Sequence, residues 1–537
     1  MYIKIFLLNL WPKDKKKGLH PMQIPLFNTV LSWILKKRKY QIDMFMSFPI
    51  DTQKEVLFNL LNKAQFTEIG VKYNFSEIKD YESFAKRMPI LQYEEVEPII
   101  ERARKGNDNI FWPTKIEWFA KSSGTTNAKS KFIPVSNEAL EDCHFKAGKD
   151  MLCLFINNNE HTEMFKGKCL RLGGSSAVYE NNDTNFGDLS AIIIENMPFW
   201  ADISSAPSQK TALMSEWESK MEAIIQETVH EDITSLMGVP SWMLVLLNRV
   251  LEITGKNNIL EVWPNLEVFF HGGVNFNPYR EQYKELIPSD TFKYYETYNA
   301  SEGFFAIQDK NNSDELLLML DYGIFYEFIP MDKFDHKNWD AIPLEKVELN
   351  KNYALVISTN SGLWRYMIGD TVKFTCLKPY RIKITGRTKH FINAFGEELI
   401  IENAEEAIKT ACKQTNSEIV DYTAAPIFMN GNKNGSHEWL IEFKTQPENL
   451  QEFTVILDNA LKSLNSDYEA KRYKDMTLSL PNISQARKGL FYDWLKMKGK
   501  LGGQHKVPRL SNQRELMEEL LSLPEDPFLV YNNFKGL

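Results

Sequence analysis

Three short apolar segments of this sequence each end in a turn of small residues, and helical patterns separate them. The segments cover residues 169–172, 266–270 and 292–298, and the turns that follow begin at Gly173, His271 and Asn299. Amphipathic patterns with a helical repeat occupy residues 212–229 and 241–253. Strands that alternate with helices in this way predict an α/β sheet, and such sheets bind ligands at the carboxyl ends of their strands.

The pattern becomes β-rich between residues 314 and 386. Five short strand-like segments, with few helical patterns between them, cover residues 316–320, 324–329, 353–358, 371–375 and 381–385. Successive strands of this kind favour an antiparallel subdomain, which we predict to be a distorted barrel. Residues 386–389 read Gly-Arg-Thr-Lys and interrupt it with a flexible, basic stretch.

A new unit begins after this interruption. Helical patterns at 400–411 and 450–464 alternate with strand-like segments at 438–443 and 476–480. Because 537 residues exceed one ordinary core, we predict two domains. A large N-terminal α/β domain over 22–388 contains the β-rich subdomain, and a small, mobile C-terminal α+β domain covers 389–537. Residues 1–21 precede the first helical pattern, and we expect them to be a non-essential extension.

Composition argues against several classes of protein. The net charge of −8 disfavours a broad nucleic-acid-binding surface, and no uninterrupted apolar run reaches the length that spans a membrane. The five cysteines are scattered without a Cys-x-x-Cys spacing, so neither a zinc site nor a disulfide framework is indicated. We therefore expect a cytoplasmic protein without a nucleic-acid or membrane partner.

The segment from Lys121 to Lys131 gathers hydroxyl groups around one glycine. It reads Lys-Ser-Ser-Gly-Thr-Thr-Asn-Ala-Lys-Ser-Lys. Hydroxyl and backbone N–H groups bind phosphate oxygens, and lysine supplies the opposite charge. A solvated Ser/Thr turn is the alternative interpretation. A P-loop NTPase is disfavoured, because Lys129 stands where that motif needs its second glycine.

Three further loops carry charged side chains with a possible role. Glu302 ends a turn that starts at Tyr298, and such a glutamate can ligate Mg²⁺ or be an ordinary surface carboxylate. Asp370 ends a glycine-flanked turn and can accept both hydroxyls of a ribose, or instead cap N–H groups of the turn. Lys506 lies in a glycine-rich loop, where it is either solvated or carried to a phosphate by a mobile domain.

Taken in order, these motifs resemble those of the GH3 family of acyl-acid amido synthetases, within the superfamily of adenylate-forming acyl ligases. The chain is identified as a bacterial-type member. Residues 122–126 match the phosphate-loop motif of the family, and residues 298–302 match its tyrosine-to-glutamate motif. Residues 366–370 match its third motif, although Met367 stands where the family usually has arginine. Residues 386–389 match the interdomain hinge, and residues 506–509 match the motif near the end of the chain.

The resemblance implies an ATP-dependent ligase that uses Mg²⁺. A carboxylic acid would attack the α-phosphate of ATP, pyrophosphate would leave, and an amino-acid amine would convert the acyl-adenylate into an amide and AMP. It implies that small-molecule acids and amino acids are the partners. An acyl-CoA ligase and a non-catalytic nucleotide-binding protein remain alternatives.

The resemblance also assigns roles to residues. The phosphate loop would be formed by Ser122, Ser123, Gly124, Thr125 and Thr126. Glu302 would hold Mg²⁺. The rest of the nucleotide site would comprise Tyr298 against the adenine, Asp370 on the ribose, Ser301, Arg387, and the turn Gly272, Gly273 and Val274. Lys389 and Lys506 would complete the catalytic site after the small domain swings.

Overall fold

The computed structural model describes most of the chain between residues 38 and 524. The described residues are 38–122, 131–173, 179–181, 184–214, 216–274, 276, 279–334, 339–388, 391–429, 434–475, 477–498 and 507–524. The predicted extension over residues 1–21 lies outside them. Within them, no helix is both long and apolar enough to cross a membrane.

A helical layer opens the described chain. Its helices are α3 (Pro49–Ala64), α4 (Glu68–Lys72), α5 (Tyr81–Arg87) and α6 (Tyr93–Arg104). Helix α3 has proline in its first turn and buries Leu57, Leu60, Leu61 and Ala64 on one face, as its apolar repeat predicts. Helix α5 starts at a capping box between Asp80 and Ser83.

One hydrogen-bonded sheet of twelve strands forms the centre of the described fold. Its parallel part comprises β3 (Lys168–Leu172), β6 (Ser205–Ala206), β7 (Ile233–Gly238), β8 (Val268–Gly272) and β9 (Lys293–Ala300). The three apolar segments that end in small-residue turns are β3, β8 and β9, so the predicted α/β sheet is confirmed.

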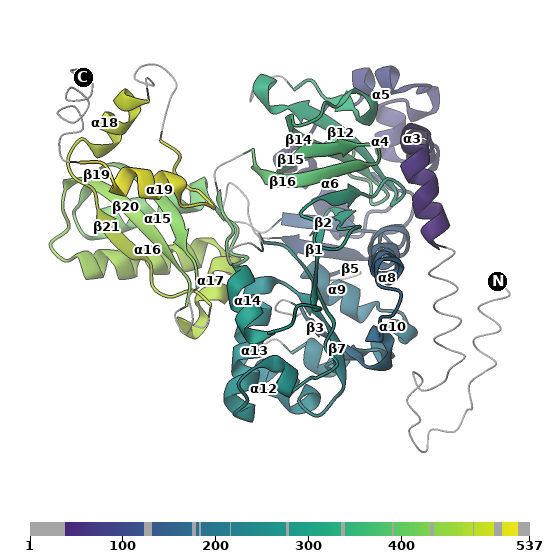
Figure 1. Cartoon of the computed structure of the whole chain (residues 1–537). Coiled ribbons are helices and arrows are strands. Elements are labelled where there is room, and N and C mark those ends of the chain that lie inside the picture. Colours follow the sequence, from purple (N-terminus) through teal and green to yellow (C-terminus); the bar gives the residue numbers. More distant parts are fainter. Residues whose placement is uncertain are drawn as a thin grey trace, which may run out of the picture.

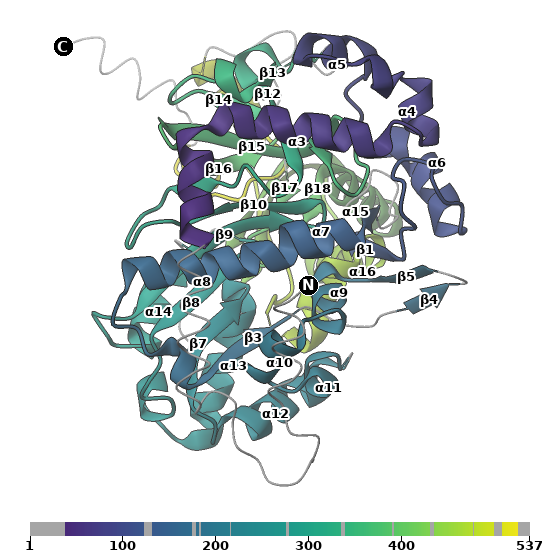
Figure 2. The ribbon, with the colours of Figure 1, turned by 90° about the vertical axis from the view of Figure 1, so that its right-hand side faces the viewer.

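Helices cover both faces of this parallel part. On β8, Phe269 packs with α13 (Pro240–Thr254) and α14 (Arg280–Leu286), whereas its neighbour Phe270 packs with α8 (Lys146–Asn158). Side chains of successive strand residues point to opposite faces, so both faces need an apolar cover. Figures 1 and 2 show α13 and α8 on opposite sides of the strands. The other helices of this region are α9 (Leu189–Glu195), α10 (Phe199–Ile203), α11 (Gln209–Ala212) and α12 (Trp217–Thr228).

The β-rich stretch continues the same sheet with antiparallel strands. They are β10 (Gly303–Ile307), β11 (Leu316–Leu318), β12 (Ile324–Pro330), β13 (Ile342–Pro343), β14 (Asn352–Thr359), β15 (Tyr366–Leu377) and β16 (Tyr380–Arg387). All five predicted segments are strands. Helix α3 lies across them in Figure 2, in the same layer as α8. Since β10 pairs with β9, the two parts share one sheet, and their junction is close to the turn that carries Glu302.

A smaller sheet carries the hydroxyl-rich segment. Its order is β2 (Lys131–Val135), β1 (Trp118–Ser122), β5 (Thr184–Gly187) and β4 (Tyr179–Asn181). Strands β1 and β2 are antiparallel and pair Ser122 with Lys131, so residues 123–130 connect the two strands of a hairpin. After β2 come α7 (Asn137–Ala139) and a π-helical stretch (Leu140–Phe145), which leads directly into α8.

The C-terminal elements form a separate α+β arrangement. The sheet has the order β19 (Glu418–Ile427), β20 (Ser436–Thr445) and β21 (Asn482–Gln485). The remaining elements are β17 (Phe391–Ile392), β18 (Leu399–Ile400), α15 (Ile401–Gln414), α16 (Leu450–Leu464), α17 (Ser466–Arg472), α18 (Leu490–Met497) and α19 (Glu515–Leu521). The strand predicted at 476–480 is wrong, because the strand that pairs with β20 is four residues long and begins at Asn482. Here Leu478 makes only an isolated bridge to Gly435.

The C-terminal elements lie against α13 and α14 (Figure 1). Ser241 donates a hydrogen bond to the carbonyl of Phe395 at 3.2 Å, and Gln282 donates one to the carbonyl of Met429 at 2.6 Å. The ammonium of Lys471 lies 3.6 Å from the centre of the Trp242 ring, a cation–π contact across the interface. This interface brings residues 391–398 to the edge of the large sheet.

Candidate active site

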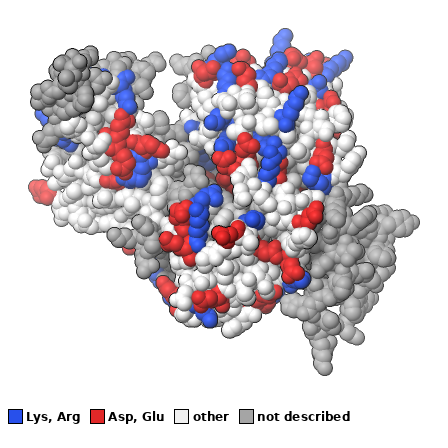
Figure 3. All heavy atoms as spheres, viewed as in Figure 1, with Lys and Arg blue, Asp and Glu red and all other residues white. Residues whose placement is uncertain are grey.

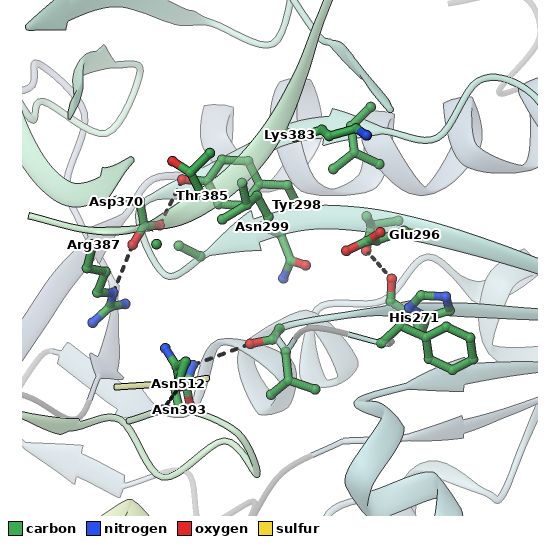
Figure 4. A pocket seen from close by; sticks show the side chains of 18 of the residues that line it. His271, Glu296, Tyr298, Asn299, Asp370, Lys383, Thr385, Arg387, Asn393 and Asn512 are labelled. Carbon is green, nitrogen blue, oxygen red and sulfur yellow. Dashed lines mark hydrogen bonds and ion pairs between the residues drawn. The ribbon is translucent and has the colours of Figure 1, made fainter. Parts of the chain in front are cut away.

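A cavity of about 740 Å³ opens at the carboxyl ends of β8 and β9. Strands β15 and β16 contribute another wall, and residues of the C-terminal elements, including Asn393 and Asn512, contribute a third. Figure 4 shows side chains from these elements converging on the same space. The size is typical of a cavity that takes a nucleotide-sized ligand. Its position at the strand ends is the one predicted from the sequence.

Tyr298, Asp370 and Arg387 form a hydrogen-bonded group in this cavity (Figure 4). The Tyr298 hydroxyl donates to Asp370 Oδ2 at 2.7 Å, and Arg387 Nε donates to Asp370 Oδ1 at 2.8 Å. Strand register explains part of the arrangement, because Asp370 on β15 is directly opposite Arg387 on β16. Burial, together with the Asp370 carboxylate, raises the pKa of Tyr298 well above its usual value, so the hydroxyl remains a donor.

The carboxylate of Asp370 keeps hydrogen-bonding capacity for a ligand. A carboxylate has about four lone-pair directions, and the contacts with Tyr298 and Arg387 use two of them. Asp370 lines the cavity. Its remaining lone pairs can therefore accept two hydroxyl protons from a ribose.

Glu302 lies in the turn between β9 and β10, next to Ser301, and both line the cavity. Burial raises the pKa of Glu302 to about 7, and the nearby ammonium of Lys131 opposes that rise. Burial lowers the pKa of Lys131, and Glu302 in turn opposes that shift. The sequence showed Lys131 only as the last residue of the hydroxyl-rich segment. The fold makes it the charged neighbour of Glu302.

The residues present are compatible with Mg²⁺ in one specific way. Among the described residues, no three His, Cys, Asp or Glu side chains gather into a group that would enclose a metal ion. Protein-bound Mg²⁺ commonly uses one or two carboxylates, with substrate phosphates and water as its other ligands. A single carboxylate at Glu302 fits that requirement if a nucleotide occupies the cavity.

The turn after β8 supplies a wall that consists of backbone. A Cβ on Gly272 would lie 2.6 Å from the carbonyl oxygen of Thr297, and Gly273 has a φ of +84°. Both positions therefore require glycine. Gly273 and Val274 line the cavity, and Asn393 donates a hydrogen bond of 3.4 Å to the Gly273 carbonyl. The turn thus lines the same cavity as Tyr298.

Several predicted site residues lie outside the described part of the chain: Ser123, Gly124, Thr125, Thr126, Lys389 and Lys506. Their predicted roles remain predictions. Ser122 is the last residue of β1, and its hairpin partner Lys131 lines the cavity. The predicted residues Gly273, Val274, Tyr298, Ser301, Glu302, Asp370 and Arg387 all line it.

Met367 does not face this cavity. Its side chain is 6% exposed and packs with Ile90, Ile329 and Val356 in an apolar cluster. The position thus contributes to the apolar core of the fold. The arginine of this segment is Arg365, whose backbone has a φ of +42° immediately before β15.

Sequence reasoning did not single out one end of the cavity. That end is lined by His271, Phe276, Arg280, Glu296, Asp314 and Lys383. Glu296 precedes Tyr298 by two residues, so strand alternation places both side chains on one face of β9. That spacing from the motif tyrosine was the feature of the sequence from which Glu296 could have been predicted to line the cavity. Asn393, Glu398 and Asn512 of the C-terminal elements had no comparable signal, since the interface alone brings them to the cavity.

The chain matches three protein-family models in sequence order. They are the GH3 family N-terminal domain over residues 38–292, the GH3 family central domain over 317–387 and the GH3 family C-terminal domain over 402–515. The chain belongs to the GH3 family.

Relatives within the GH3 family are distant in sequence and similar in length. Indole-3-acetic acid-amido synthetase GH3.3 of Arabidopsis thaliana is 21% identical, with 87% of this chain and 90% of that protein covered. The 4-substituted benzoates-glutamate ligase GH3.12 of the same plant is 23% identical, with coverages of 82% and 89%.

Solved structures with a similar fold include another GH3 protein. The AtGH3.15 acyl acid amido synthetase in complex with 2,4-DB has a TM-score of 0.57 at 16% identity, covering 88% of this chain and 93% of its own. A 2-hydroxyisobutyryl-CoA ligase in complex with 2-HIB-AMP and CoA has a TM-score of 0.52 at 13% identity, with coverages of 88% and 91%. The GH3 chain thus has the fold of adenylate-forming ligases.

Proposed function

We propose that this GH3 protein is an acyl-acid amido synthetase. It activates a carboxylic acid with ATP as an acyl-adenylate and transfers the acyl group to the amine of an amino acid, releasing AMP and pyrophosphate. The observation that carries the proposal is the Tyr298–Asp370–Arg387 group in a cavity whose wall also holds Glu302. This cavity thus contains one carboxylate that can accept the hydroxyls of a ribose and a second carboxylate on the side where the phosphates would lie.

The described residues have different roles in nucleotide binding, according to where they lie in the cavity. Asp370 accepts the ribose hydroxyls, and Tyr298 and Arg387 fix the orientation of its carboxylate. The Gly272–Gly273 turn and Tyr298 confine the base between them. At the other end, Lys131 supplies a positive charge for phosphate oxygens, beside the predicted hydroxyl loop. Such fixed charges stabilise charge that develops on the phosphate without a cost for reorganisation.

Glu302 is the residue that would hold Mg²⁺. The ion would bridge phosphate oxygens and neutralise their charge. Burial disfavours the ionised form of this carboxylate and raises its pKa to about 7, and a bound dication would compensate for the lost hydration. We also propose that residues 1–21 are dispensable, that the domain boundary is near residue 389, and that Lys389 and Lys506 act on the closed site.

The proposed partners are small molecules. Acidic and basic side chains are intermixed on the face of the molecule in Figure 3, without a basic stripe that would follow a nucleic acid. All five cysteines are free thiols in the structure, which supports a reducing cytoplasmic location.

The test measures ATP–pyrophosphate exchange across a panel of carboxylic acids, and then product formation with amino acids or with coenzyme A. We expect exchange with at least one acid and an amide product that depends on an amino acid. The alternative is an acyl-CoA ligase, because a CoA ligase has a similar fold. Such an enzyme would form product only with the thiol of coenzyme A. Absence of exchange with every acid, although ATP binds, would favour a non-catalytic nucleotide-binding protein.

A further inference from the structure

The ammonium group of Lys471 is buried where the C-terminal elements meet α13. It lies 3.6 Å from the centre of the Trp242 ring, and Lys471 is only 8% exposed. A Cβ on Gly396 would lie 3.1 Å from Lys471 Cε and 3.3 Å from Lys471 Nζ, so the absence of a side chain at Gly396 leaves room for the lysine. Lys471 is thus held between a ring of α13 and the main chain at Gly396.

A buried cation at this interface loses hydration. Burial lowers the pKa of Lys471 to about 8, and nearby carboxylates, of which Asp467 acts most strongly, oppose that shift. The face of an indole ring attracts a cation, and the attraction is larger where water is excluded. An apolar side chain of similar length would fill the same space without the loss of hydration. The charge therefore indicates a role beyond filling space.

Lys471 extends from a helix that is anchored within the C-terminal elements. The next residue of α17, Arg472, donates from Nε to the carboxylate of Asp458 on α16 at 2.6 Å. The hydroxyl of Tyr468, one turn earlier on α17, donates to the same carboxylate at 2.8 Å. Because α17 is anchored on both sides of Lys471, its backbone gives the lysine a fixed starting point for the contact with Trp242.

The segment 394–396 is held by helices α13 and α17 together. The Ser241 hydroxyl, next to Trp242 on α13, donates to the Phe395 carbonyl at 3.2 Å, and Lys471 closes on Gly396 from the opposite side. Gly396 has a φ of +89°, and Glu398 has a φ of +41°. Left-handed backbone of this kind is uncommon outside glycine and persists where surrounding contacts hold it. The shape of this segment therefore depends on its contacts.

Two cavity residues flank the segment 394–396. On one side, Asn393 donates to the Gly273 carbonyl at 3.4 Å. On the other side, the Glu398 carboxylate lies 3.7 Å from Nη2 of Arg387, whose Nε donates to Asp370 at 2.8 Å. Asn393, Arg387 and Asp370 appear around the same cavity in Figure 4. Contacts that fix the middle of this segment thus also fix the carboxylate that faces Arg387.

We propose that Lys471 is a positioning residue for the ribose site. Its contact with Trp242 holds the segment 394–396 in place, so that Glu398 reaches Arg387 and helps to orient the guanidinium toward Asp370. Lys471 does not belong to the described residues that line the cavity, so it acts through Glu398 and Arg387. The proposal rests on the proposed function, because it places a nucleotide in this cavity with its ribose at Asp370.

The test compares ATP with 2′,3′-dideoxy-ATP, which lacks both ribose hydroxyls, and measures Kd by calorimetry on the full-length chain. We expect the parent to bind ATP at least about ten-fold more tightly than the analogue. Lys471→Met keeps an unbranched side chain and removes its charge. It should weaken ATP binding about three- to ten-fold and change the Kd of the analogue less than about two-fold. Trp242→Leu should have the same effect, whereas Trp242→Phe keeps a ring face and should retain most of the affinity for ATP.

A double-mutant cycle tests the route through Glu398. Glu398→Gln should weaken ATP binding to a similar extent as Lys471→Met. The double variant Lys471→Met/Glu398→Gln should bind ATP no more weakly than either single variant, because both substitutions remove the same contact with Arg387. Lys413→Met, at an exposed position in the last turn of α15, is the matched control and should behave as the parent.

Equal weakening of ATP and of the analogue in Lys471→Met would overturn the proposal, because a general effect on packing does not distinguish the two nucleotides. Additive losses in the double variant would overturn it as well. Pyrophosphate exchange by the parent, measured in parallel, separates this proposal from the proposed function. A selective loss of ATP affinity in Lys471→Met without exchange in the parent contradicts the ligase function alone, and absence of ATP binding in the parent contradicts both.

Discussion

The guanidinium of Arg365 binds the carboxylate of Glu327 through contacts of 2.8–3.0 Å in the interior of the sheet. Both side chains are almost fully buried. Arg365 also donates to the carbonyls of Ala85 and Met88, and it directly precedes β15, which carries Asp370. The pair thus ties the start of the strand that presents Asp370 to the helical layer and to β12.

Arg365→Met should destabilise the protein by about 3–5 kcal/mol, because it leaves the charge of the Glu327 carboxylate buried without a cation, with only the Tyr81 hydroxyl still donating to it. Urea unfolding measures the change. The double variant Arg365→Met/Glu327→Met should recover part of the loss, since it removes both charges. Arg249→Ala breaks an exposed pair with Glu222 and serves as the control, with little change expected. A single variant as stable as the parent would show that this pair does not hold the strand.

Glu302→Gln should reduce ATP–pyrophosphate exchange by a factor of about a hundred or more, even at saturating Mg²⁺. The amide preserves the shape of the turn and removes the charge that a dication needs. Nucleotide binding without Mg²⁺ should change far less, which separates a metal role from a structural one. Exchange at the parental rate would remove Glu302 from the metal site.

Lys506→Ala should slow formation of the acyl-adenylate and leave the reaction of supplied acyl-adenylate with amine nearly unchanged. A lysine near the α-phosphate stabilises the charge that develops while the adenylyl group passes from pyrophosphate to the carboxylate. The second half-reaction has no such step. Single-turnover measurements of each half-reaction test this. Normal adenylation with slow amide formation would assign the residue to the second step instead.

Glu296→Gln should change how stability depends on pH. Folding raises the pKa of Glu296 from 4.5 to about 7, so the folded state binds this proton more tightly than the unfolded state. The carboxylate therefore lowers stability progressively as pH rises from about 4.5 to 7, and by a constant amount above that. Because the side chain is half-buried and Arg280 is near, we expect the variant to be more stable than the parent by about 1 kcal/mol at pH 8.

That difference should disappear below about pH 4.5, where the carboxyl is protonated in both states. Glu285→Gln, at an exposed position, should track the parent across the whole range. Denaturant unfolding at pH 4.5, 6 and 8 provides the comparison. A gain that is independent of pH would mean that the substitution acts through packing.

Local patterns predicted the strands of the large sheet, because apolar segments and small-residue turns are short-range features. Residues 169–172 lie within β3, and the segments predicted at 266–270 and 292–298 overlap β8 and β9, which begin one or two residues later and extend two residues further. The error at 476–480 has a local cause as well. Leu478 is buried and apolar like a strand residue, yet it bridges a single residue, and the paired strand that follows is mostly polar.

The candidate site was predictable where it follows a motif and not where it depends on packing between distant segments. Asp370 and Glu302 are at turns that the sequence marks. Lys131 becomes a neighbour of Glu302 only when the β1–β2 hairpin and the turn between β9 and β10 meet in the fold. Asn393 reaches Gly273 only when the C-terminal elements dock. Contacts of that kind depend on the tertiary arrangement, which no local pattern encodes.

The glycine turn at Gly272 and Gly273 limits how this cavity can diverge during evolution. A wall made of main-chain atoms offers no side chain to exchange, and a Cβ at Gly272 has no room. New substrate preferences must therefore arise on the other walls of the cavity. These walls are formed by β15, β16 and the residues that the C-terminal elements contribute. Comparing homologues with different substrates should find variation concentrated at those positions, while the glycine wall stays unchanged.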